Sequence, residues 1–177
     1  IAHAYYGRAI AEFGDEDAVQ EWSMSLPEGI EDEPQYWMAA AVWAERRGDI
    51  KQAARGYLQA ATLEDDNAEA LSRLAIVLAE LQMDAASRAV SERAGNLAQM
   101  RDAVDLLHSR QDNSQKVAVR IAKAMQSLGR PWEAAGWLRA GAMMNHELDP
   151  SLREVYASVR ATLTAETPWQ LPESKIA

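Results

Sequence analysis

The side chains that most often carry out chemistry in proteins are sparse in this sequence and widely separated. The chain of 177 residues has three histidines, His3, His108 and His146, and no cysteine. No two histidines are close enough to form a metal-binding motif such as HExxH, and thiolate zinc sites, disulfides and cysteine nucleophiles are excluded. Motifs for a serine nucleophile, a phosphate-binding loop or a dinucleotide site are also absent. We therefore expect no enzymatic activity, no metal and no other cofactor.

The acidic run that begins at Glu64 and includes Asp65 and Asp66 is the stretch that most resembles a cation site. Its carboxylates are consecutive, whereas a calcium loop needs ligands at alternating positions. The run instead predicts a polar turn, with Asp66 or Asn67 as the N-cap of the next helix.

The charge balance narrows the choice of partner. The formal net charge is -9 and the sequence pI is about 4.8. Binding to nucleic acid needs clustered Lys and Arg, so no nucleic-acid partner is expected, and an anionic membrane is disfavoured for the same reason. No run reaches the roughly 18 apolar residues of a membrane span, so membrane insertion is not expected. A protein with a basic or neutral surface fits better. The compartment stays open, with the cytoplasm favoured for a soluble chain.

The two ends of the sequence indicate a piece of a longer protein. Ile1 is not an initiator Met, and no basic start or signal-like apolar core comes after it. A helical pattern begins at Ile1 itself. Residues 166–177 contain Pro168 and Pro172 and are expected to form a C-terminal tail or linker.

An internal repeat organises the rest of the chain. Gly14 and Gly48 are 34 positions apart, each is followed by Asp, and a further 34 positions lead to Gln82. A fourth turn contains Gly129. The residue seven positions before each turn is small: Gly7, Ala41, Ala75 and Ala122. Three of the four residues twelve positions after the turns are also small: Leu26, Ala60, Ala94 and Gly141. Small residues at fixed positions allow two helices to pack closely.

This arrangement resembles the tetratricopeptide repeat, a helix–turn–helix unit of about 34 residues. The best unit, residues 34–67, has signature residues at Trp37, Ala41, Gly48, Ala53, Tyr57 and Ala60, with Asp65 in place of the usual closing proline. The other units are expected at about 1–26, 68–110 and 115–145, with a closing helix at 150–164. The resemblance implies an all-α, right-handed solenoid of antiparallel helix pairs, forming a single domain over residues 1–165. We expect nine or ten helices; the alternative is an unrelated helical bundle with alanine-rich faces.

The register breaks after Gln82, because thirteen additional residues precede Gly129. Apolar or small residues continue at spacings of three and four from Met83 to Leu107, the period of one amphipathic helix. We predict that the second helix of the third unit extends to about His108. The alternative is a break at Gly95, because Gly followed by Asn ends helices well.

The resemblance also implies where a ligand would bind, because the first helix of each unit lines a concave surface in this family. The positions carried over as the candidate partner-binding groove are Met38, Val42, Glu45, Arg46, Ser72, Ile76, Val119 and Lys123. The Lys and Asn that clamp a chaperone's C-terminal carboxylate in some members are missing. Met38, Val42, Ile76 and Val119 are instead expected to form an apolar strip for an amphipathic helix or extended peptide. The alternative is that they touch a neighbouring unit or an added helix of this chain.

The sequence thus predicts a protein–protein interaction scaffold, whose ligand comes from another protein or from other domains of the parent chain. Two alternatives remain. The chain is either a non-catalytic arm of a larger enzyme or assembly, or a structural module that associates with itself.

Overall fold

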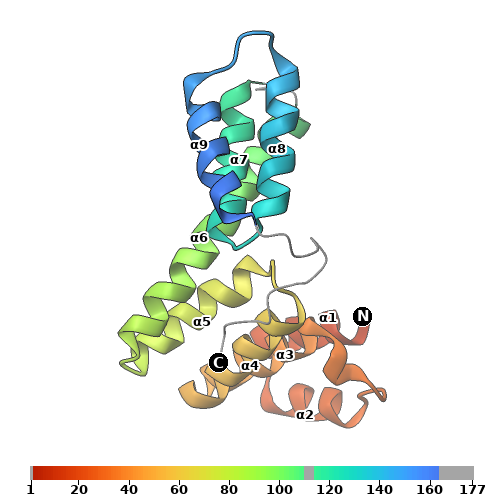
Figure 1. Ribbon diagram of the computed structural model, residues 1–177. Helices are drawn as coiled ribbons and strands as arrows, with labels where there is room; N and C mark the ends of the chain where they lie inside the picture. The colour runs from red at the N-terminus through yellow and green to blue at the C-terminus, as the bar shows by residue number, and fades with distance from the viewer. Residues whose placement is uncertain (1, 110–113, 164–177) are drawn as a thin grey trace. The chain divides into compact units, whose positions relative to one another are not determined.

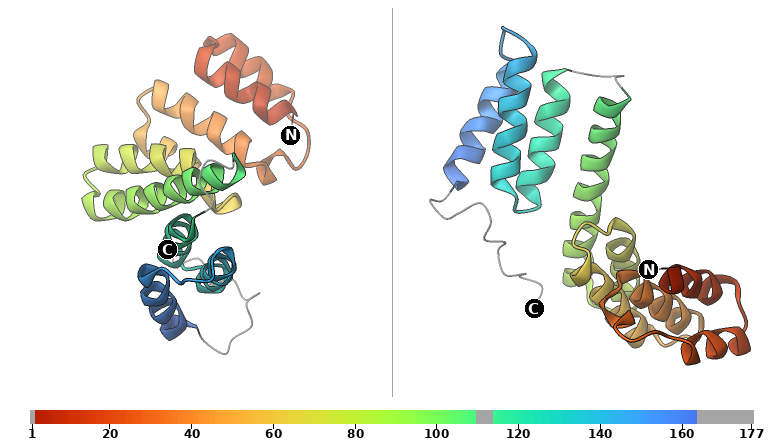
Figure 2. Two further views of the ribbon diagram at one scale, coloured as in Figure 1. Left: turned by 90° about the horizontal axis from the view of Figure 1, so that it is seen from above. Right: turned by 90° about the vertical axis from the view of Figure 1, so that its right-hand side faces the viewer.

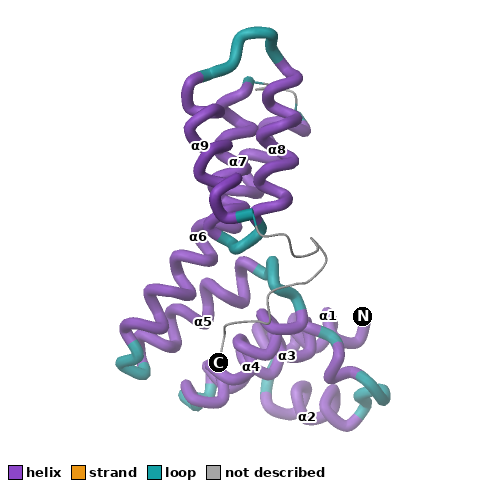
Figure 3. Tube along the Cα trace, in the orientation of Figure 1, coloured by secondary structure: helices purple, strands orange, loops and turns teal. Residues whose placement is uncertain are grey.

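The computed structural model describes residues 2–109 and 114–163, and these residues form helices joined by turns, with no strand among them (Figure 3). The described part of the chain contains nine α-helices, within the predicted nine or ten. The sequence predicted one domain over residues 1–165. That single domain stays a prediction, and the internal contacts group the chain into two compact units, Ile1–Ala94 and Gly95–Ala177, each described by itself.

Unit 1 is a stack of helix pairs. Its helices are α1 (Ala2–Phe13), α2 (Glu16–Met24), α3 (Pro34–Arg46), α4 (Ile50–Leu63) and α5 (Ala68–Glu80), with a short 3-10 helix η1 (Ile30–Asp32) before α3. Helix α3 packs against α1 on one side and against α4 on another, and α5 packs against α4 (Figure 1). The first helices of the three repeats are therefore α1, α3 and α5, and the second helices are α2 and α4.

Local backbone chemistry fixes the turns of unit 1. Gly48 and Gln82 have φ angles of 76° and 60°, so these two equivalent turn positions adopt the same left-handed conformation although only one is glycine. Asn67 is the N-cap of α5, because its side chain accepts a hydrogen bond of 2.9 Å from the backbone N–H of Ala70. The predicted polar turn at the acidic run is therefore confirmed.

Small residues bring α3 and α4 together. Ala41 and Ala60 are fully buried. A Cβ added to Gly56 would lie 2.8 Å from the Cβ of Ala41 and 3.1 Å from its Cα. The two helices therefore approach until backbone meets backbone at this point, as the pattern of small residues predicted.

One long helix accounts for the break in the repeat register, as predicted. Helix α6 (Asp84–His108) has 25 residues and passes through Gly95 without a stop. In unit 1 the hydroxyl of Ser87 donates a 2.7 Å hydrogen bond to the carbonyl of Ala75 on α5. In unit 2 Ala103 joins a core cluster with Val117 and Ile121.

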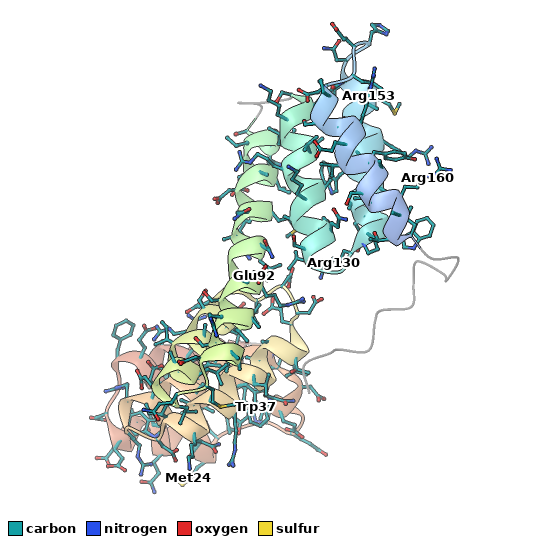
Figure 4. All side chains as sticks on the ribbon, turned by 60° about the vertical axis from the view of Figure 1, so that its left-hand side comes forward. Met24, Trp37, Glu92, Arg130, Arg153 and Arg160 are labelled. Atoms are coloured by element: carbon teal, nitrogen blue, oxygen red, sulfur yellow. The ribbon has the colours of Figure 1, made fainter. Side chains whose placement is uncertain are left out.

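Unit 2 continues with α7 (Gln115–Ser127), α8 (Pro131–Met144) and α9 (Pro150–Thr162), which lie side by side (Figure 2). Helix α9 packs on both α7 and α8 and is the predicted closing helix. Asp149 caps α9 by accepting hydrogen bonds from the N–H and hydroxyl of Ser151. Arg153 and Arg160 project outward from α9 (Figure 4). The tail predicted at residues 166–177 lies outside the described residues.

Two mid-helix glycines have no packing reason. A Cβ added to Gly95 in α6 or to Gly136 in α8 would have no neighbour within 4 Å. Alanine loses less backbone entropy than glycine on forming a helix. We expect Gly95→Ala and Gly136→Ala each to raise the free energy of unfolding by about 0.5–1 kcal/mol in urea titrations followed by circular dichroism.

The control for these variants is Gly141→Ala, which should lower the free energy of unfolding. A Cβ at Gly141 would lie 2.8 Å from the Cβ of Ala118. Destabilisation by Gly95→Ala would contradict the continuous α6.

Candidate functional site

The first helices of unit 1 present a polar surface on which charged side chains connect three elements. Arg8 of α1 donates a 3.2 Å hydrogen bond from Nη1 to Oε1 of Gln35 on α3, and its Nη2 pairs with Glu69 on α5. The hydrogen bond to Glu69 is the main cause that raises the pKa of Arg8. Arg8 therefore pairs with a residue that lies 61 positions further along the chain.

A second arginine repeats this pattern. Arg73 of α5 lies 3.8 Å from the carboxylate of Glu12 on α1 and 3.7 Å from that of Glu45 on α3. Glu45 also accepts a 2.5 Å hydrogen bond from the hydroxyl of Tyr57, which is buried in α4. Burial, followed by this hydrogen bond, raises the pKa of Tyr57, so the phenol stays protonated and continues to donate.

We call this surface the first-helix face. Its residues are Arg8, Glu12, Gln35, Glu45, Glu69, Ser72, Arg73 and Ile76. The side chains in its ion pairs keep 24% to 45% of their surface exposed. Pairs at such exposure add little stability, about 0–1 kcal/mol each. Their main effect is to hold the charged groups in defined positions.

Three of the eight predicted groove residues lie on this face. Glu45 takes part in the pairing, Ser72 is exposed, and Ile76 leaves 55% of its surface exposed. Arg46 is exposed, but its Nη1 donates to the carbonyls of Ala11 at 2.7 Å and Gly14 at 2.9 Å. It therefore ties the end of α3 to the end of α1.

The apolar strip expected at Met38, Val42 and Val119 does not lie on the surface, which corrects that interpretation. Met38 is fully buried, and Val42 and Val119 are each 5% exposed. Val119 shares a core cluster with Leu152 of the closing helix α9, so the alternative of an added helix is the right one for this residue.

The helices that pack on each first helix account for the difference. Met38 and Ser72 occupy equivalent positions of successive repeats, as do Val42 and Ile76. Helix α3 packs against both α1 and α4, whereas α5 packs against α4 within unit 1. The equivalent side chains of α5 are therefore left open.

The last predicted residue, Lys123, is exposed on α7. It belongs with Val119 to unit 2, whereas the other six predicted residues belong to unit 1. The candidate site is therefore restricted to the first-helix face of unit 1.

The sequence reasoning missed a cavity of about 540 Å³ between α2 and α3. Trp22, Tyr36 and Trp43 contribute aromatic walls, and the ring centroids of Trp22 and Tyr36 are 6.0 Å apart. The sequence feature that could have indicated this cavity is the group of aromatic residues near the first repeat unit, which matches the repeat pattern least well.

The described residues contain no group of three or more histidine and acidic side chains placed to hold a metal ion. Within the same ranges, no helix is both long enough and apolar enough to cross a lipid bilayer.

Comparison with known proteins agrees with the helix-pair architecture. A tetratricopeptide-repeat family model matches residues 16–164, which cover most of the chain and both compact units. No curated protein and no solved structure matches the chain. The paired helices, the turns that recur at the repeat interval and this match together show that the chain belongs to the tetratricopeptide-repeat family.

Proposed function

We propose that this chain is a protein-binding scaffold and that the first-helix face of unit 1 receives a helix or extended peptide from the partner. The observation that supports the proposal is the combination, on one face, of exposed Ile76 with charged groups held in place by Arg8 and Arg73. Tetratricopeptide-repeat proteins generally mediate protein–protein interaction and are generally non-catalytic.

Ile76 is the proposed anchor for the partner. It is one helical turn from Ser72, which is exposed and whose hydroxyl donates to the carbonyl of Ala68 in its own helix. The small side chain of Ser72 therefore leaves room beside Ile76. Binding energy is concentrated in side chains that become fully desolvated, and an apolar residue of the partner could enclose Ile76 in this way.

The charges on the face define the chemistry of the partner. Acidic residues outnumber basic ones, since Glu12, Glu45 and Glu69 stand against Arg8 and Arg73. The chain as a whole carries a net charge of -9. The partner segment therefore contains an apolar residue flanked by lysine or arginine. The basic charges set the orientation and association rate of the segment more than its affinity.

The test is a peptide-display selection against the immobilised chain, followed by titration of the enriched peptides. We expect enriched peptides to carry an apolar residue next to basic ones. Ile76→Glu should weaken their binding at least about tenfold, an effect of ~1.4 kcal/mol, by placing a carboxylate where the apolar contact forms. Circular dichroism should show that the variant remains folded.

The matched control is Met143→Glu, which places the same charge on α8 at a residue that is 88% exposed. This variant should bind like the wild type. Equal weakening by both variants would show that net charge is responsible, and full binding by Ile76→Glu would contradict the proposed site.

A further inference from the structure

Helix α1 carries an exposed apolar stripe on the side away from its buried small residues. Ala2, Tyr6, Ala9 and Phe13 follow one another at spacings of four, three and four, so they share one side of the helix. Tyr6 is 62% exposed and Phe13 is 83% exposed. The opposite side of α1 carries the buried residues Ala4, Gly7 and Ala11, and α1 packs against α3 and α2.

The repeat register identifies the same stripe in the other first helices. The equivalent residues are Tyr36, Ala40, Trp43 and Arg47 at α3, Ala70, Leu74, Val77 and Leu81 at α5, and Val117, Ile121, Ala124 and Leu128 at α7. The element that covers these four positions can therefore be identified for each helix.

In α5 and α7, the second helix of the preceding unit covers the stripe. In α5, Ala70, Leu74 and Val77 are 0% to 3% exposed, and α5 packs against α4. In α7, Val117 and Ile121 form a cluster with Ala103 of α6, and neighbouring apolar residues of α6 pack against that cluster. The second helix of the unit before thus buries the stripe of each of these first helices.

The stripe of α3 is covered less than those of α5 and α7 but more than that of α1. Its four stripe residues all line the cavity of about 540 Å³ that lies between α2 and α3. The short helix α2 precedes α3 but leaves this space beside it. The stripe is therefore covered to the extent that a second helix precedes it and packs on it. Within residues 1–94, no second helix precedes α1.

We propose that the stripe of α1 is the docking surface for the second helix of a further repeat unit, joined directly before α1. The occupant is an amphipathic helix like α4, connected by a turn like the one between Leu63 and Ala68. A stripe on a single short helix is too narrow for a stable free dimer, which needs roughly 800 Å² from each partner. A covalently joined helix needs no such area, because its effective concentration is high.

The experiment adds such a helix from the chain itself. Residues 50–68 are copied and fused directly before Ile1, so that Ala2 follows the copied turn as Ala70 follows the original one. We expect the midpoint of thermal unfolding to rise by about 5 °C or more, which is about 1 kcal/mol for a unit of this size. Amide hydrogen exchange in α1 should slow at the same time.

Two controls make the result specific. One additional alanine between the copied segment and Ile1 turns the helix by about 100° and should abolish the gain. Tyr6→Lys should lower the midpoint of the fusion but leave that of the unfused chain nearly unchanged, because Tyr6 is exposed there.

Three results would overturn the proposal. The first is a fusion in which the added residues stay non-helical and α1 exchanges as fast as before. The second is a rise that is the same with and without the additional alanine. The third is an unfused chain that sediments as a dimer and that Tyr6→Lys converts to a monomer, because the stripe would then belong to a second copy.

Discussion

Replacing Met38 by glutamate should unfold unit 1, whereas the same substitution at Ile76 should leave it folded. Met38 is fully buried and Ile76 is 55% exposed, although both lie on first helices. Truncating a buried methionine alone costs about 2–5 kcal/mol. A carboxylate without a partner in the core adds the cost of desolvating its charge. We expect the free energy of unfolding to fall by at least about 3 kcal/mol, out of a typical total of ~5–15 kcal/mol.

The measurement is thermal and urea unfolding followed by circular dichroism, with Met38→Gln as the uncharged control of similar size. Protonation of a buried carboxyl removes its charge, so Met38→Glu should regain stability as the pH falls through the raised pKa of that group in the folded state. Met38→Gln should show no such change. A Met38→Glu variant that melts like the wild type would show that Met38 lies on the surface, and it would support the apolar strip predicted from the sequence.

Local chemistry made the turns and the helix order predictable from the sequence. A left-handed turn at Gly48 and a cap at Asn67 depend on residues within a few positions, so their signals are present in a short window. The length of α6 was likewise contained in the spacing of its own apolar residues. Gly14 is the exception, because its φ is not in the left-handed region although it aligns with Gly48.

Some small residues were predicted correctly without their physical reason. The sequence marked Gly7 as a close-contact position, and a Cβ there would lie 2.1 Å from the ring of Trp22. The indole N–H of Trp22 donates a 3.0 Å hydrogen bond to the carbonyl of His3. The partner of Gly7 is thus an aromatic ring from the next helix, and a repeat pattern does not specify which large residue fills the space beside a small one.

The candidate site was less predictable, because the burial of a first-helix residue depends on which helix packs next to it in space. Met38 and Ser72 have the same register, yet one is buried and the other exposed. The pairing of Arg8 with Glu69 joins helices that no local pattern connects. Sequence reasoning therefore predicted Glu45, Ser72 and Ile76 on the candidate face, but it did not predict that Met38 and Val42 are buried.

Replacing Ala41 by leucine should lower the free energy of unfolding by about 1–3 kcal/mol. Ala41 is fully buried, and its Cβ faces Gly56 so closely that even one added carbon on Gly56 would clash. A leucine side chain has nowhere to go unless α3 and α4 separate, which would loosen the contacts of both helices. Urea titration should show a lower midpoint, with a slope that changes little if the native fold persists.

The control is Ala79→Leu, which makes the same substitution in α5 at an exposed residue and should change stability little. Ala122 holds the position of Ala41 in unit 2 and is also fully buried. Ala122→Leu should therefore destabilise unit 2 by a similar amount, since the requirement comes from the repeat and not from one helix pair. If Ala41→Leu and Ala122→Leu both unfold at the midpoint of the control, the shared register of the two units is wrong, even though each helix is correctly placed.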